Sequence, residues 1–192
     1  RRAARLVKSY EPFPHVEAVR ARVTPKTVTR LLREHGVGRE FDVLSLDIDS
    51  YDYLVLDVLL KDFRPRLVVT EINEKIPPPV RFHVEYDPHF RLRHHFYGYS
   101  IQSLAELCAR HGYTILELEY NNAFLAPKEI AGAQVEGVAE IYRRGYLERP
   151  DRRKKFSSNL DVDILHSLGP AEAIDFIERF FARHRGKYEL SL

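Results

Sequence analysis

Two short apolar runs dominate the hydrophobic pattern in the first half of the chain. They cover residues 43–48 and 67–72, and they lead into Asp-Ile-Asp and Glu-Ile-Asn, respectively. The segment between them carries apolar residues three and four positions apart, which is the spacing of a helix, until Pro65 ends it. Units of this kind join parallel strands. The pattern therefore predicts a buried, parallel pair of strands with a helix between them.

The remaining elements follow from the same kinds of pattern. We expect helices at residues 1–10, 24–36, 100–112, 135–142 and 171–181, and strands at residues 15–23, 113–120 and 123–126. Thr24 and Ser100 are the expected N-caps of two of these helices, and Asp49 or Ser50 is expected to cap the helix between the apolar runs. The turn of the last hairpin is expected at Asn121-Asn122, with positive φ.

Residues 74–99 show no regular period. Three consecutive prolines, at 77–79, come near the start of the segment, and aromatic residues then alternate with histidine and arginine. Loops of this length are uncommon unless they are functional or disordered, and the aromatic content does not suit a disordered linker. We therefore expect an irregular segment that lies over the carboxyl ends of the strands and covers a bound small molecule.

Oxygen-bearing side chains gather where the two predicted strands end. Asp47 and Asp49 share one face of the first strand, and Glu71 and Asn73 share one face of the second, because strand side chains alternate. Ligands of open α/β sheets bind at this edge. Asp47 lies in an apolar run and needs a buried partner, a ligand or a raised pKa, whereas Asp49 could simply cap the next helix. If these groups converge, the carboxylates could also hold Mg²⁺.

Composition narrows the class of protein. A chain of 192 residues with 44% hydrophobic content suits one domain with an appendage, and we place these at residues 1–130 and 131–192, the second part being helical. No apolar stretch reaches the roughly 18 residues of a membrane span, and the arginine-rich start lacks the apolar segment of a signal peptide. We therefore expect a cytoplasmic protein with no membrane partner.

Charge and sulfur content add further limits. The balance of 30 basic and 28 acidic residues argues against a nucleic-acid partner for the whole molecule. The only cysteine, Cys108, excludes a disulfide within one chain and is expected to be an inert core residue. The chain contains no methionine, and we expect it to be the later part of a longer protein.

Four strings of this sequence resemble a known family. LSLDIDSYDYLVLDVL, PRLVVTEIN, FYGYSIQSLAELCARHGYTI and NNAFLAP are similar to the later two-thirds of class I S-adenosylmethionine-dependent methyltransferases, close to the FkbM-type proteins, over roughly residues 16–127. The resemblance implies an α/β, Rossmann-like fold, with a mostly parallel sheet, an antiparallel hairpin strand at its end and a helical C-terminal extension. It also implies S-adenosylmethionine as the cofactor and methyl transfer to the oxygen of a small or sugar-like acceptor.

Roles for individual residues follow from this resemblance together with the chemistry of the residues themselves, and the alternative for the histidines is that they are solvated loop residues. The implied catalytic residues are Asp47, Glu71 and His95, the last as a general base. The implied cofactor-binding residues are Asp47, Asp49 and Tyr51. The implied substrate-binding residues are Asn73, Arg93, His94 and Tyr97. The metal site, if Mg²⁺ is used, would consist of Asp47, Asp49 and Glu71.

The sequence departs from the family in one respect. The glycine-rich turn after the first strand and the acidic residue that holds the cofactor ribose do not occur at the expected places. We therefore expect the chain to lack the N-terminal cofactor-binding segment and to bind S-adenosylmethionine weakly or not at all. The alternative is a non-catalytic binding or scaffold module that keeps the sheet and uses its helical tail for a partner.

Overall fold

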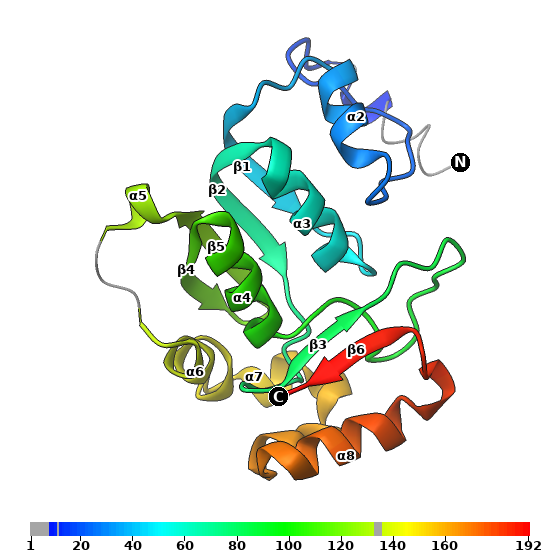
Figure 1. Ribbon diagram of the computed structural model, residues 1–192, viewed down its shortest axis with the longest axis vertical. Coiled ribbons are helices and arrows are strands. Elements are labelled where there is room, and N and C mark those ends of the chain that lie inside the picture. The colour runs from blue at the N-terminus through cyan, green and yellow to red at the C-terminus, as the bar shows by residue number, and fades with distance from the viewer. Residues whose placement is uncertain (1–7, 11, 133–135) are drawn as a thin grey trace.

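Strands and helices alternate in the first two-thirds of the chain, and short helices dominate the last third (Figure 1). The computed structural model describes residues 8–10, 12–132 and 136–192. The strands are β1 (Glu40–Leu46), β2 (Arg64–Glu71), β3 (Arg81–Val84), β4 (Tyr113–Glu119), β5 (Asn122–Pro127) and β6 (Tyr188–Ser191). The α-helices are α2 (Val28–Glu34), α3 (Asp52–Asp62), α4 (Ile101–His111), α5 (Lys128–Ala131), α6 (Val138–Tyr142), α7 (Arg152–Lys155) and α8 (Pro170–Phe180). The other helical segments are the π-helix η1 (Arg143–Leu147) and the 3₁₀-helices η2 (Ser157–Asn159), η3 (Asp163–Ser167) and η4 (Ala182–His184).

The two apolar runs form neighbouring parallel strands, as their pattern predicts. β1 and β2 pair in parallel and are joined by α3, and Leu46 lies opposite Thr70 in their register. This register brings the next residue of each strand, Asp47 and Glu71, to the same edge of the sheet. The α/β class is therefore confirmed, and so is the predicted strand–helix–strand unit.

The main sheet is mixed rather than mostly parallel. Its order is β1-β2-β5-β4, and β5 runs antiparallel to both of its neighbours. The hairpin after α4 places its second strand inside the sheet, between β2 and β4, so the reversed strand makes two antiparallel ladders. The prediction of a mostly parallel sheet is wrong for this reason.

Helices α3 and α4 cover one face of this sheet (Figure 1). Val55 and Leu56 of α3 and Leu104 of α4 are fully buried in one cluster with Val68 and Leu125 of the sheet. Removal of these apolar side chains from water is the main source of stability for the sheet. None of the described helices combines the length and the apolar character that a membrane crossing requires.

Local signals place α4 correctly. The Ser100 hydroxyl accepts a hydrogen bond of 3.2 Å from the backbone N–H of Ser103, and Gly112 follows the helix with φ of 70°. Both ends were predicted, because an N-cap hydroxyl and a left-handed glycine satisfy the free backbone groups of a helix.

The hairpin between β4 and β5 turns at a different residue from the predicted one. Tyr120 has the positive φ, 59°, and the Asn121-Asn122 pair does not. The reason is tertiary: the Tyr120 N–H donates to the carbonyl of Gly145, and the Tyr120 ring packs against Phe156. Contacts with the C-terminal part therefore fix the turn.

The N-terminal region differs from the prediction in two ways. Residues 15–23 form no strand, and they run instead along α2, where Val19 and Val23 face Leu31 across an apolar groove. Without a partner strand, their ladder groups have no sheet to join. The helix predicted from Thr24 begins at Val28, after a turn in which the carbonyl of Thr24 accepts from the Val28 N–H. Residues 1–7 of the predicted first helix lie outside the described residues.

Residues 74–99 form part of the core rather than a separate lid. The segment contains the four-residue strand β3, which pairs with β6, and Phe82, Phe96 and Tyr99 are buried. It does lie at the carboxyl ends of β1 and β2, because the Gly98 N–H donates to the carbonyl of Ser50. The segment is irregular, as predicted, but its aromatic residues fill the interior.

The C-terminal part shares this core. Tyr146, Val162, Ile177 and Phe181 belong to the same buried cluster as the sheet residues. The predicted helices appear as α6 and α8, although residues 133–135 lie outside the described residues. The extension is not wholly helical, because its last strand, β6, completes a two-stranded sheet with β3.

Candidate functional site

Three carboxylates converge at the carboxyl ends of β1 and β2. Asp47 follows the last residue of β1, Asp49 lies two residues further on, and Glu71 is the last residue of β2. One carboxylate oxygen of each lies within 4.8 Å of the others. Asp47 and Asp49 are exposed, whereas Glu71 is half-buried. The structure therefore brings together the predicted trio, but Asp47 is not the buried residue that its apolar neighbours suggested, because β1 has already ended at Leu46.

Asp52, which the sequence analysis did not single out, fixes the loop that carries two of these carboxylates. Its buried carboxylate accepts hydrogen bonds of 2.8 Å from the N–H groups of both Ile48 and Ser50. Asp49 between them takes a left-handed φ of 53°. The prediction that Asp49 or Ser50 caps α3 is wrong, because the N-cap position is Tyr51, without a side-chain cap, and the Ser50 hydroxyl donates instead to the carbonyl of Ile48. An acidic residue in the first turn of a helix was the available sequence signal.

Electrostatics single out Glu71 within the trio. Burial, followed by the negative charges of Asp47, Asp49 and Glu74, raises the pKa of Glu71 to about 7. The Asn121 side-chain amide donates a hydrogen bond to the Glu71 carboxylate, which opposes part of this rise. Glu71 is thus a carboxyl group able to gain or lose a proton near neutral pH.

Asn73 is committed to holding the backbone of residues 74–99. It is fully buried, and its amide donates to the carbonyls of His95 at 2.8 Å and Tyr97 at 2.9 Å. Its Oδ1 is buried and has no hydrogen-bond partner among the described residues. The structure therefore uses the Asn73 amide to hold the loop, whereas the resemblance implies a substrate-binding residue.

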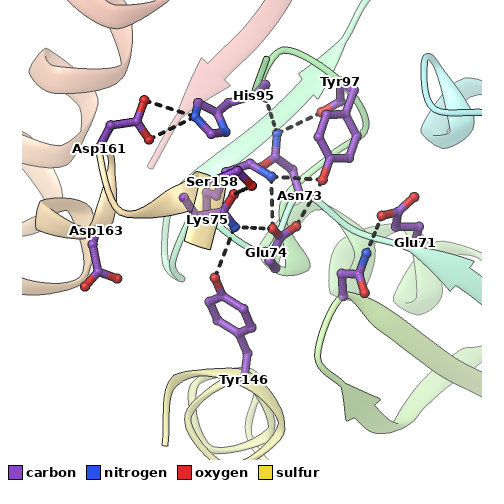
Figure 2. A network of polar contacts seen from close by, with 12 residues as sticks. Glu71, Asn73, Glu74, Lys75, His95, Tyr97, Tyr146, Ser158, Asp161 and Asp163 are labelled. Carbon is purple, nitrogen blue, oxygen red and sulfur yellow. Dashed lines mark hydrogen bonds and ion pairs between the residues drawn. The ribbon is translucent and has the colours of Figure 1, made fainter. Parts of the chain in front are cut away.

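Beside Asn73 lies a buried polar network that the sequence analysis missed (Figure 2). The Glu74 carboxylate accepts hydrogen bonds from Lys75 at 3.0 Å, Tyr97 at 3.1 Å and Asn159 at 2.5 Å. The side chains of Glu74 and Lys75 are only 2% and 4% exposed. A buried ion pair is retained only where further hydrogen bonds satisfy both partners, and Tyr97 and Asn159 provide them here. The only sequence signal was that Glu74 and Lys75 directly follow the predicted Glu-Ile-Asn end of β2.

Tyr97 belongs to this network rather than to an open site. Its hydroxyl accepts from the Lys75 ammonium at 2.9 Å and donates to Glu74. Burial, together with the charges of Glu74 and Glu71, raises the pKa of Tyr97 far above its ordinary value. Tyr97 therefore stays a neutral hydroxyl.

His95 does not join the carboxylate trio. Figure 2 shows His95 and Glu71 on opposite sides of Asn73, and the buried His95 ring pairs with Asp161 at 3.1 Å. Burial, together with the positive charge of Lys75, lowers the pKa of His95. The implied role of a general base beside the trio does not fit this position.

Three other predicted site residues also lie elsewhere. Arg93 and His94 line a separate hollow beside α8. The Tyr51 hydroxyl donates to the carbonyl of Val23, and its buried ring packs edge-on against Tyr86. Tyr51 therefore fastens the N-terminal segment and does not open toward a cofactor.

Comparisons of this chain with protein-family models, with curated proteins and with solved structures gave no match.

Proposed function

We propose that the chain forms the acceptor-binding part of an S-adenosylmethionine-dependent O-methyltransferase with a Rossmann-like sheet. The sheet order supports this proposal, because β1, β2 and β4 run in one direction and only β5 is reversed. The reversed strand of a methyltransferase-like sheet belongs to a hairpin near its end, as here. The carboxylate trio lies at the carboxyl edge, where ligands of such sheets bind.

The observation that carries the proposal is the half-buried carboxyl of Glu71 beside Asp47 and Asp49, with its pKa raised to about 7. A general base is most effective when its pKa lies near the working pH. An acceptor hydroxyl placed between the three carboxylates would give its proton to Glu71 as its oxygen becomes an ether oxygen. Asp47 and Asp49 would orient that hydroxyl or its neighbours on a sugar-like acceptor by accepting their hydrogen bonds.

The described residues do not form a cradle for the nucleoside of S-adenosylmethionine. Close backbone approach to such a group needs a glycine turn, and Gly98 is the glycine with positive φ beside this edge. A side chain at Gly98 would meet only the backbone nitrogen of Asn73, at an ordinary 3.7 Å, so this glycine does not mark a cradle. We therefore expect no tight binding of S-adenosylmethionine by this chain alone.

The trio can also hold Mg²⁺, a hard cation that prefers oxygen ligands. Asp47, Asp49 and Glu71 would be its protein ligands. The cation would lower the pKa of the acceptor hydroxyl and, by its charge, that of Glu71.

The test is methyl transfer from millimolar S-adenosylmethionine to a panel of sugars and phenols, with and without Mg²⁺. Both the chain and any longer natural form of it are assayed. Glu71→Gln should lower the rate by about a hundredfold or more, since a general base contributes on the order of 10²–10⁴. The matched control is Asp42→Asn, because Asp42 is an exposed carboxylate of β1 away from the trio.

Absence of transfer by folded protein in every form would contradict the proposal and favour the scaffold module. The positions of Asn73 and Tyr97 favour that alternative, since both are used in internal hydrogen bonds. Transfer that survives Glu71→Gln unchanged would keep the enzyme but remove Glu71 as its base.

A further inference from the structure

A second hollow, away from the carboxylate trio, lies between the end of residues 74–99 and the C-terminal helices. Its volume is about 310 Å³, which is within the range of small-molecule sites. It is lined by Arg93, His94, Phe96, Arg179, Phe180, Phe181, Arg183 and His184. Two regions that are distant in the sequence thus contribute to it: the loop, and the consecutive elements α8 and η4.

The lining is strongly basic. Arg93, Arg179 and Arg183 are exposed and make no ion pair with any residue that the structure describes. By contrast, Arg81 and Arg152 each pair with a carboxylate. None of the residues that line the hollow is acidic. Guanidinium groups held around one space without a counter-charge are suited to an anion with several oxygens.

A helix end explains only part of this arrangement. Arg179 lies in the last turn of α8, where a cation is favoured by the helix dipole. Arg93 comes from the loop 80 and more residues earlier in the chain, and Arg183 lies beyond the helix, in η4. Their convergence is therefore not a consequence of the dipole of α8.

The floor of the hollow is aromatic. The His184 ring lies flat on Phe96, with centroids 3.9 Å apart and an interplanar angle of 6°, and Phe181 meets Phe96 edge-on at 5.2 Å. Burial, followed by the positive charges of Arg183, Lys187 and Arg93, lowers the pKa of His184. At neutral pH the ring is thus an uncharged planar surface beside the guanidinium groups.

We propose that this hollow binds a nucleoside phosphate, with the phosphates against Arg93, Arg179 and Arg183 and the planar base against the aromatic floor. Guanidinium groups bind phosphate oxygens in pairs, and aromatic rings stack on any base because every base has a π-face. This site is separate from the proposed methyl-transfer site, since it shares no residue with Asp47, Asp49 and Glu71.

Isothermal titration with ADP, adenosine and pyrophosphate tests both halves of the proposal. ADP should bind, pyrophosphate should bind more weakly because it lacks a base, and adenosine should show no binding at millimolar concentration. Raising the salt from about 50 to 200 mM should weaken ADP binding, since exposed charges are screened. Equal binding of ADP and adenosine, or no binding of ADP at millimolar concentration, would overturn the proposal.

Substitutions of the arginines that line the hollow test whether ADP binds there. Arg179→Gln and Arg183→Gln should each weaken ADP binding about tenfold, the usual effect of losing one hydrogen bond to a charged group. Arg30→Gln is the control, because Arg30 is an exposed helix arginine of α2. Both substituted side chains of the hollow are exposed, so folding should be retained. Unchanged affinity in both variants would place the ADP elsewhere and overturn the assignment.

Two further measurements test whether the base stacks on an aromatic ring and whether this site is independent of the carboxylate trio. Phe180 is the exposed phenylalanine of the lining, whereas Phe96 and Phe181 are buried, so its ring is open to a stacked base. Phe180→Leu should weaken ADP binding and leave pyrophosphate binding unchanged, and an equal loss for both ligands would contradict stacking of the base. Glu71→Gln should leave ADP affinity unchanged, so failure of the methyltransferase proposal does not alter this result. Binding of a single-stranded oligonucleotide a hundredfold tighter than ADP would replace the small ligand by a nucleic acid.

Discussion

The Asn159 side-chain amide donates a hydrogen bond of 2.5 Å to the carboxylate of Glu74, across 85 residues of sequence. Both side chains are buried. This contact joins the C-terminal part to the segment that follows β2, and Glu74 lies three residues after Glu71 of the candidate site. Figure 2 shows Glu74 within the polar network beside Asn73. The two regions therefore support each other through a polar contact as well as through apolar packing.

Asn159→Ala should lower the free energy of unfolding by about 1–3 kcal/mol, since it leaves a buried carboxylate short of one donor. Urea unfolding followed by circular dichroism measures the change. Asn122→Ala is the control, because Asn122 is exposed on β5 and should change stability by less than about 0.5 kcal/mol. Equal stability of the two variants would show that the Glu74 network tolerates loss of this donor.

Lys75→Met should cost about 3–5 kcal/mol, because it leaves Glu74 as a buried charge without its cation. In a Glu74→Gln background, the same substitution should cost much less, since no uncompensated charge remains. A double-mutant cycle from denaturant unfolding gives the coupling of the pair. A coupling energy near zero would show that the ion pair does not stabilise the fold. Lys61→Met, at an exposed lysine of α3, is the matched control.

The pH dependence of the free energy of unfolding should report the raised pKa of Glu71. Its pKa is raised to about 7 in the folded protein, from an ordinary value of 4.5. Stability linked to Glu71 is therefore fully present below about pH 4.5 and is lost as the pH rises toward 7, because folding disfavours the charged form. The free energy of unfolding of Glu71→Gln, relative to that of the wild type, should rise by about 1–2 kcal/mol between pH 4 and pH 8. This value is smaller than the full pKa shift would give, because solvent screens the partly exposed carboxyl.

Unfolding of both proteins at pH 4, 6 and 8 measures this difference. A pH-independent difference would mean that Glu71 titrates at its ordinary value. If the trio binds Mg²⁺, millimolar Mg²⁺ should stabilise the wild type at pH 8 more than it stabilises Glu71→Gln, because a ligand that binds only the folded state adds to its stability.

Gly145→Ala should destabilise the protein by at least about 1–3 kcal/mol, the cost of overpacking. An added Cβ would overlap the backbone carbonyl of Leu118, which is part of β4 and cannot move aside as a flexible side chain would. Gly137→Ala is the matched control: no atom of the described residues lies within 4 Å of its added Cβ, and its φ of −64° suits alanine. Thermal unfolding should separate the two variants, and similar melting temperatures would show that η1 can shift away from β4.

The sequence alone determined the elements whose causes are local. The apolar runs of β1 and β2, the helical spacing of α3 and the ends of α4 at Ser100 and Gly112 all follow from neighbouring residues. The alternation of side chains along strands was also sufficient to predict that Asp47 and Glu71 lie close together, since two parallel strands end at one edge of the sheet. These predictions depend on backbone geometry that is the same in every protein.

Tertiary structure decided what each predicted site residue does. His95 and Tyr97 are residue types that often act in catalysis. In the fold, however, the polar atoms of their side chains are paired with Asp161 and Glu74, respectively. The turn at Tyr120 was likewise set by Gly145 and not by the asparagines next to it.

The physical reason lies in the separation of the partners along the chain. The pairing of Asn121 with Glu71 requires β5 to insert beside β2. The pairing of Asn159 with Glu74 requires the last third of the chain to pack against the segment that follows β2. Burial of apolar surface drives both events and is non-directional, so it does not specify in advance which polar groups will meet. Sequence patterns therefore predicted the strands of the main sheet and helices α3 and α4, whereas packing determined the remaining strands and which side chains remain free for chemistry.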